Sequence, residues 1–186
     1  KTFTFHDKLC SKAEPGQFVM IWIPGVDEIP MSISSAEPNK PVSITVEKVG
    51  EATSTLHKKT IGDTIGVRGP YGNSFTLTSG NVMIVGGGTG LMPLMPLTEK
   101  IVRLATKIVF LLGAKTKDEL LFLDRIEQIL SKVNAEIIAT TEDGSYGLKG
   151  IVTDQAEKRL AKERFDMVYT CGPEQMMHRM FSLAER

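Results

Sequence analysis

The residues best placed to do chemistry lie at positions 86–90, where the chain reads Gly-Gly-Gly-Thr-Gly. They follow Val82–Val85, an apolar run that predicts a buried strand of a parallel sheet. Glycine has no Cβ, so the backbone can turn sharply there and approach a ligand closely. A helix that begins after such a turn directs its amide groups at the turn, where a pyrophosphate binds well. The stretch therefore predicts a dinucleotide site. A glycine-rich turn without a ligand stays the alternative, because Leu91 stands where the three-glycine fingerprint has its last glycine.

Cys171 is the other residue with reactive chemistry. A cysteine nucleophile needs a base beside it, and the sequence offers only His6, His57 and His178. His178 is seven residues beyond Cys171, on a predicted helix that carries it about two turns away from the strand end. We therefore interpret Cys171 as a packing residue rather than a nucleophile. No group of histidine, cysteine and carboxylate residues in the sequence has the spacing of metal ligands.

The elements that position these residues alternate between strand and helix from about residue 79 onward. Apolar runs predict strands at Val82–Val85, Ile108–Leu112, Ile137–Ala139 and Met167–Thr170. Helical patterns cover Leu91–Leu104, Lys117–Leu130 and Asp154–Lys162, and a last helix follows Pro173. This order predicts a parallel sheet with helices on both faces, which binds ligands beyond the carboxyl ends of its strands. Four segments fall at those ends: Gly86–Gly90, Gly113–Lys115, Thr141–Gly147 and Cys171–Pro173.

The first 78 residues have the periodicity of strands instead. Strands are predicted at Phe18–Ile23, Val42–Val46 and Thr64–Gly69, with one short helix at Ala52–Lys59 that Thr53 or Ser54 could cap. Short strands with frequent turns indicate an antiparallel sandwich or barrel. Three segments, Ile29–Ser34, Gly50–Ser54 and Gly69–Phe75, are either plain turns or ligand loops. We expect two domains, 1–78 and 79–186.

Composition limits the function further. Lys+Arg and Asp+Glu are 22 each, so the net charge is zero, which argues against binding nucleic acid or a membrane surface through bulk charge. No apolar run is long enough to span a bilayer. The two cysteines do not make a disulfide framework, which favours a cytoplasmic protein. The chain starts in a strand pattern without methionine and stops within a helical pattern, so we expect residues to be missing at both ends.

The order of motifs resembles the ferredoxin–NAD(P) reductase superfamily, and within it the electron-transfer subunits of dihydroorotate dehydrogenase. The segments that carry the resemblance are Gly69–Phe75, Gly86–Leu94, Gly113–Leu121, Glu142–Gly147 and Cys171–Met176. It covers nearly the whole chain. It implies a Greek-key β-barrel that holds FAD, followed by a Rossmann-like α/β domain that binds NAD.

The resemblance also implies site residues. FAD would contact Pro30, Met31 and Ser32, then Val46, Glu47 and Lys48, and then Thr53 and Ser54. The pyrophosphate of NAD would face Gly86, Gly87, Gly88, Thr89 and Gly90, while Cys171, Gly172, Pro173 and Met176 would lie beside the nicotinamide, close to the flavin. The family's Arg-Pro-x-Ser segment reads Ile29-Pro30-Met31-Ser32 here, so the arginine that helps to hold the flavin phosphates is absent. Lys48 and Arg68 are candidates to replace it.

The family subunit carries a [2Fe-2S] cluster on four cysteines in a C-terminal tail. Only Cys171 lies in the second half of this chain, so no metal ligands are expected in it, and the cluster is expected in a tail that it lacks. The implied activity passes electrons from a catalytic partner subunit, in a heterotetramer, through [2Fe-2S] and FAD to NAD⁺ in pyrimidine biosynthesis. A flavin subunit of a cytoplasmic hydrogenase or of an NADPH–ferredoxin oxidoreductase is the alternative. Two non-redox hypotheses remain, a scaffold that has lost flavin and a regulator that binds NAD alone. No acidic residue ends the strand Ile108–Leu112, so NAD rather than NADP rests on the resemblance.

Overall fold

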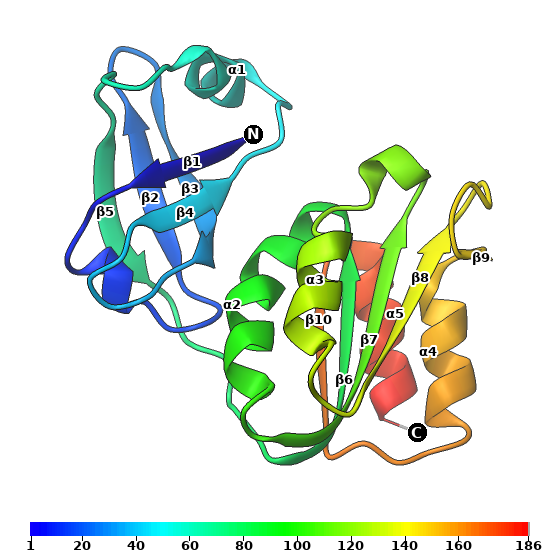
Figure 1. The fold of residues 1–186 in the computed structure, drawn as a ribbon. Coiled ribbons are helices and arrows are strands. Elements are labelled where there is room, and N and C mark those ends of the chain that lie inside the picture. Colours follow the sequence, from blue (N-terminus) through cyan, green and yellow to red (C-terminus); the bar gives the residue numbers. More distant parts are fainter. Residues whose placement is uncertain (186) are drawn as a thin grey trace. The chain divides into compact units, whose positions relative to one another are not determined.

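The computed structural model describes residues 1–185 and divides the chain into two compact units (Figure 1). The first, Lys1–Phe75, is called the β domain here, and the second, which begins at Thr76, the α/β domain. The boundary falls after Phe75, whereas the sequence places it after residue 78. The two-domain fold class predicted from the sequence, an antiparallel domain followed by a parallel α/β domain, is confirmed.

The β domain is built from five antiparallel strands, which pair in the order β1-β4-β3-β2-β5. Its elements are β1 (Thr2–Phe5), the short 3₁₀ helix η1 (Cys10–Lys12), β2 (Phe18–Ile23), β3 (Asp27–Ser35), β4 (Val42–Thr45), α1 (Glu51–Lys58) and β5 (Gly66–Tyr71). Strands β2, β3 and β4 follow one another as neighbours, and β5 returns to lie beside β2, which is the Greek-key order.

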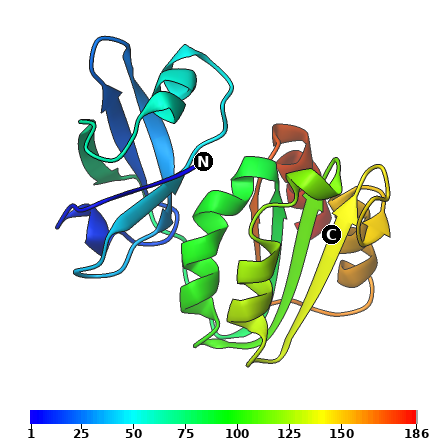
Figure 2. The same ribbon diagram turned by 45° about the horizontal axis from the view of Figure 1, so that its top comes forward.

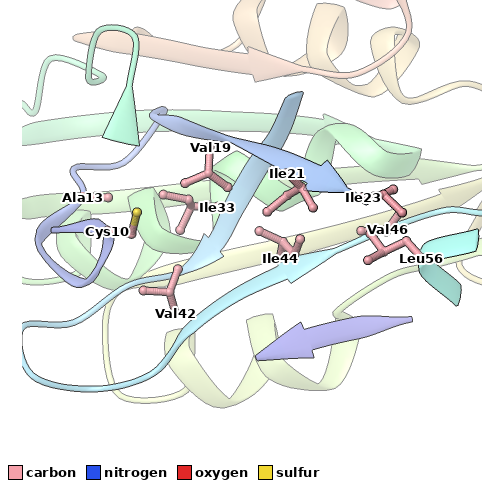
Figure 3. Packing of buried hydrophobic residues seen from close by; sticks show 10 residues of the cluster. All are labelled: Cys10, Ala13, Val19, Ile21, Ile23, Ile33, Val42, Ile44, Val46 and Leu56. Atoms are coloured by element: carbon pink, nitrogen blue, oxygen red, sulfur yellow. The ribbon is translucent and has the colours of Figure 1, made fainter. Parts of the chain in front are cut away.

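The two parts of strand β3 pair with different neighbours. The strand pairs with β2 as far as Ser32, and from Ile33 it pairs with β4 across a register shift. The inward-facing side chains of both parts of the β domain pack in a single apolar core. Figure 3 shows this core, in which Val19, Ile21 and Ile23 of β2 face Ile44 of β4 and Leu56 of α1. All five are fully buried, and each contributes about 1.5–3 kcal/mol relative to an exposed position.

Helix α1 begins one residue earlier than the sequence predicts, and its cap differs. Gly50 is the N-cap, and the predicted cap residue Thr53 stands three residues later. The Thr53 hydroxyl oxygen accepts hydrogen bonds from the backbone N–H groups of Val49 (3.0 Å) and Gly50 (2.9 Å). The Thr53 side chain therefore fixes the residues that precede the helix. As an acceptor it does not serve the N–H groups of the first helical turn.

The α/β domain is a five-stranded parallel sheet in the order β10-β6-β7-β8-β9. Its strands are β6 (Gly80–Gly87), β7 (Ala105–Ala114), β8 (Ala135–Thr141), β9 (Leu148–Lys149) and β10 (Met167–Cys171). Its helices are η2 (Gly88–Gly90), α2 (Leu91–Ile101), η3 (Lys117–Glu119), α3 (Leu123–Leu130), α4 (Val152–Leu160) and α5 (Glu174–Ala184). Helices α2 and α3 cover one face of the sheet and α4 and α5 the other, as Figures 1 and 2 show. The predicted doubly covered parallel sheet is thus confirmed.

Two predictions are wrong. The segment Ile29–Ser34, expected as a turn or a ligand loop, is part of strand β3. The helix expected over Lys117–Leu130 is broken into η3 and α3. Phe122 precedes α3 in a left-handed conformation (φ 59°), which a bulky residue rarely adopts. The backbone N–H of Lys117 donates to the hydroxyl of Ser145 (2.8 Å), 28 residues away, so a contact outside the segment fixes where η3 lies. Periodicity within the segment could not show this.

Candidate functional site

The carboxyl edge of the parallel sheet gathers the segments that the sequence places at strand ends. Strand register sets Cys171 beside Gly86, Gly87 beside Gly113, and Gly113 beside Thr140. Strand β6 has β7 on one side and β10 on the other, so the order of the strands reverses at β6. In sheets of this kind, such a reversal opens a crevice at the strand ends, where ligands bind.

A cavity of about 430 Å³ lies at this edge, within the size range of small-molecule sites. Its lining comes from the ends of β6, β7 and β8, from the start of α4 and from α5: Gly87, Gly88, Gly113, Ala114, Lys115, Glu119, Thr140, Glu142, Gly150, Ile151, Val152, Thr153, Pro173, Gln175, Met176 and Arg179. Of the predicted nucleotide residues, the structure brings Gly87, Gly88, Pro173 and Met176 together around it.

The glycines at positions 86–90 have different structural roles. Gly88 has φ +53°, and a Cβ built on it would meet no described atom within 4 Å, so its position faces the open space of the cavity. A Cβ on Gly87 would lie 2.9 Å from the Met176 sulfur. A Cβ on Gly90 would lie 2.3–2.4 Å from the backbone of Cys171 and Gly172. The motif thus leaves one position open to a ligand and uses another to pack η2 against the end of β10.

Five predicted residues do not line the cavity. They are Gly86, Thr89, Gly90, Cys171 and Gly172. A Cβ on Gly86 would point at Leu91 and Leu94 of α2, and Cys171 is paired with Gly86 in the register, so the two share the α2 side of the sheet. Burial raises the pKa of the Cys171 thiol, which keeps it neutral near pH 7. A neutral thiol fits the packing interpretation rather than a nucleophile.

Residues that the sequence did not single out complete the cavity. Gly150 and the first residues of α4 form one wall, and Arg179 of α5 contributes a guanidinium group. Its Nη2 donates to Asp154 Oδ1 (2.9 Å) and to Glu157 Oε2 (3.1 Å). Asp154 and Glu157 are three residues apart on α4 and so share a helix face. In the sequence, only this spacing of Asp154 and Glu157 points to a site for a cation. It indicates Arg179 as the partner only when the packing of α4 against α5 is known.

In the β domain, five of the predicted flavin residues lie just before α1 or in its first turns. Val46 is buried, and its carbonyl oxygen lies 2.8 Å from His57 Nε2, which ties the end of β4 to the helix. Lys48 is exposed, and a Cβ on Gly50 would meet nothing within 4 Å among the described residues. The open space at Gly50, a helix start whose N-cap Gly50 makes no side-chain cap hydrogen bond, and a nearby lysine together suit a phosphate group. Ser54, half-buried in the same turn, belongs to this group, and so does the exposed Glu47.

The remaining flavin candidates lie on β3. Pro30 is exposed, and Met31 and Ser32 are half-buried. Ile29, in the place of the family's arginine, packs against the apolar core with Met31. Arg68 of β5, one proposed replacement, donates from Nε to Glu28 Oε1 (2.8 Å) and forms a second bond to the other carboxylate oxygen. This ion pair leaves Lys48 as the better candidate cation.

The chain is similar in sequence to other proteins over most of its length. Residues 84–181 match the oxidoreductase NAD-binding domain. Over 98% of its length the chain is 43% identical to a probable dihydroorotate dehydrogenase B (NAD(+)) electron transfer subunit of Pyrococcus horikoshii, of which it covers 68%. The chain belongs to this family of electron-transfer subunits. A family member from Methanocella arvoryzae is 42% identical over 97% of the chain.

Solved structures agree with the family. A structure described for an NADH-dependent reduced ferredoxin–NADP oxidoreductase aligns with all of the chain at TM-score 0.86 and 35% identity, over 67% of that protein. A ferredoxin–NADP⁺ reductase from Plasmodium falciparum aligns at TM-score 0.82 but only 17% identity, over 83% of its length, and so shows the shared fold alone. The chain spans 66% and 63% of the length of the Methanocella and Methanocaldococcus family members. Within residues 1–185, none of the helices is both long and apolar enough to cross a membrane.

Proposed function

We propose that this chain is the flavin and nicotinamide part of the electron-transfer subunit of an NAD-dependent dihydroorotate dehydrogenase. Electrons would pass from a catalytic partner subunit, in a heterotetramer, through a [2Fe-2S] cluster and FAD to NAD⁺, in a cytoplasmic enzyme of pyrimidine biosynthesis. One observation carries the proposal. Four of the predicted nucleotide residues meet around a single cavity at the strand-order reversal, in a chain about 40% identical to proteins of that name.

The α/β domain would bind the nicotinamide nucleotide. The pyrophosphate would lie over Gly88, whose missing side chain leaves room for it. Pro173 and Met176 at the start of α5 would contact the nicotinamide end, and Gly113–Lys115 and Gly150–Thr153 the adenosine end. The predicted residues Thr89, Gly90, Cys171 and Gly172 would support this site by shaping the turn and the end of β10 beneath it.

The β domain would hold FAD, which supplies hydride exchange with the nicotinamide and single-electron exchange with an iron–sulfur centre. The first-turn amides of α1 and Lys48 would hold its phosphate groups. Pro30, Met31 and Ser32 would support the flavin ring. The two cysteines in the sequence are too few for a [2Fe-2S] cluster, which needs four thiolates. We place the cluster on residues outside this sequence.

The visible spectrum of the purified full-length protein tests the proposal. Flavin absorption bands that bleach on anaerobic addition of NADH, over a broad iron–sulfur background, are expected. A colourless protein that does not take up added FAD would overturn the proposal and favour the scaffold. Flavin without the broad background would contradict the cluster alone. Binding of NAD without any flavin would favour the regulator.

A second function is favoured by the 35% identity to the NADH-dependent reduced ferredoxin–NADP oxidoreductase structure. In that case the partner would exchange electrons with ferredoxin and NADP, and a hydrogenase partner is a related variant. Oxidation of dihydroorotate coupled to reduction of NAD⁺, measured on the complex as it is isolated from its source cells, separates the two. No such oxidation would favour the second function.

Removal of the Cys171 thiol should slow flavin reduction. In Cys171→Ala, we expect the rate at saturating NADH to fall about tenfold with full FAD content, because a cavity at the end of β10 lets the nicotinamide shift from its reactive position. Stopped-flow absorbance measures the rate. Thr170→Val is the matched control, since Thr170 points to the opposite face of the same strand and its buried hydroxyl has no hydrogen-bond partner within residues 1–185. Equal rates in both variants would count against the nicotinamide placement.

A further inference from the structure

Arg179 is the cation of the cavity wall that α4 and α5 share, and two carboxylates already hold it. Asp154 lies in the first turn of α4, and Glu157 follows one turn later. Both accept hydrogen bonds from the same Nη2 of Arg179. The three side chains are 43–46% exposed, so they remain hydrated and can exchange partners. A guanidinium group that binds phosphate normally presents these same donors to the phosphate oxygens.

The rest of the cavity lining is also poor in available positive charge. Lys115 is its second cation, and Glu119 and Glu142 are its two carboxylates. Among the residues that the structure describes, the lining cations Lys115 and Arg179, the lining carboxylates Glu119 and Glu142, and the two carboxylates bonded to Arg179 together have a net charge of −2. Lys115, Glu119 and Glu142 follow the ends of β7 and β8. In doubly wound sheets, the adenosine ribose lies beyond the end of the second strand, and β7 is the second strand of this domain.

We propose that Asp154 and Glu157 mask Arg179, and that this masking makes the cavity select a dinucleotide with a free 2′-hydroxyl over one with a 2′-phosphate. The inference rests on the proposed nucleotide site. A 2′-phosphate brings a charge of about −2 into a site that is already negative. Arg179, the cation of the lining that would attract it, already has its Nη2 bonded to two carboxylates, which also offset its positive charge. A ribose 2′-hydroxyl is instead favoured by the carboxylates of the cavity, because it can donate a hydrogen bond to Glu119 or Glu142.

Ion pairs on a hydrated surface contribute little to stability, so the mask can be removed without unfolding the domain. The double variant Asp154→Asn/Glu157→Gln keeps the size of both side chains and removes the two negative charges that offset the charge of Arg179. Asp124→Asn/Glu127→Gln is a matched control. It removes two carboxylates with the same spacing on α3, and neither residue lines the nucleotide cavity.

Two ligands without a reactive nicotinamide make the test independent of electron transfer. They are ADP-ribose and its 2′-phosphorylated analogue, and calorimetry on the holoprotein gives their dissociation constants. We expect the natural chain to bind ADP-ribose at least tenfold more tightly than the analogue. In the double variant, the analogue should bind about tenfold more tightly than before, while ADP-ribose changes less than twofold. Adding Arg179→Met to that variant should abolish the gain.

The outcomes separate this inference from the proposed function. A natural chain that binds neither ligand would overturn the nucleotide site itself. Binding of ADP-ribose with an unchanged ratio in the double variant would overturn only the masking of Arg179. The same change of ratio in the α3 control would also overturn it, since bulk charge would then explain the preference.

Discussion

Replacement of Gly88 by aspartate should raise the dissociation constant for NADH at least a hundredfold, with the FAD content of the β domain unchanged. Gly88 lines the cavity, and a side chain built on it would point into open space. An aspartate there would occupy the volume meant for the pyrophosphate and repel its charge. The backbone at Gly88 has φ +53°, and aspartate and asparagine tolerate this region better than other residues.

Gly88→Asn separates the two causes, because asparagine has nearly the shape of aspartate without its charge. We expect asparagine to weaken NADH about tenfold through volume alone, and aspartate to add a further factor of ten or more. Gly25→Asp controls for backbone strain, because Gly25 also has positive φ and open space but lies in a turn of the β domain. Titration by calorimetry measures all three. Unchanged NADH affinity in Gly88→Asp would remove the glycine turn from the nucleotide site.

The periodicity of the sequence was sufficient to find the elements of the sheet that carry the site. The run Val82–Val85 is apolar throughout because both of its faces are covered by helices, and the structure buries all four residues completely. Such runs have few alternatives in a chain that alternates strand and helix. Since parallel strands end at one edge, the residues that follow them could be expected to meet there, as Gly87, Gly113 and Pro173 do.

What the sequence could not show depends on contacts between distant segments. The masking of Arg179 requires α4 and α5 to lie side by side, and no local pattern specifies that neighbour. No acidic residue stands at the end of β7 itself, and the carboxylates of the cavity, Glu119 and Glu142, come from η3 and from the end of β8. The predicted cap of α1 is wrong for a similar reason. Thr53 has the right side chain for a cap, but its hydroxyl accepts from N–H groups that precede the helix.

The four glycines at positions 86–90 look equivalent in the sequence. In the structure, only Gly90 lies so close to the backbone of Cys171 and Gly172 that a Cβ does not fit. Its φ of −63° and ψ of −14° are ordinary helical values. At such a position, replacement of glycine by alanine normally stabilises a protein by about 0.4–1 kcal/mol, because the unfolded chain loses freedom. Local conformation alone therefore predicts that Gly90→Ala is harmless.

The packing predicts the opposite sign. The new Cβ would lie 2.3 Å from the carbonyl oxygen of Cys171 and 2.4 Å from the Cα of Gly172, and backbone atoms cannot rotate away as a side chain would. We expect Gly90→Ala to destabilise the α/β domain by about 3 kcal/mol or more. Gly88→Ala, which has open space but a left-handed backbone, should cost only about 1–2 kcal/mol. Hydrogen exchange of the amides of β6 and β10, followed by mass spectrometry, reports the opening free energy of this domain separately. If Gly90→Ala were as stable as the natural chain, the close approach of η2 to the end of β10 would be wrong. The placement of Gly87 against Pro173 at the nucleotide cavity, which depends on that approach, would then also be wrong.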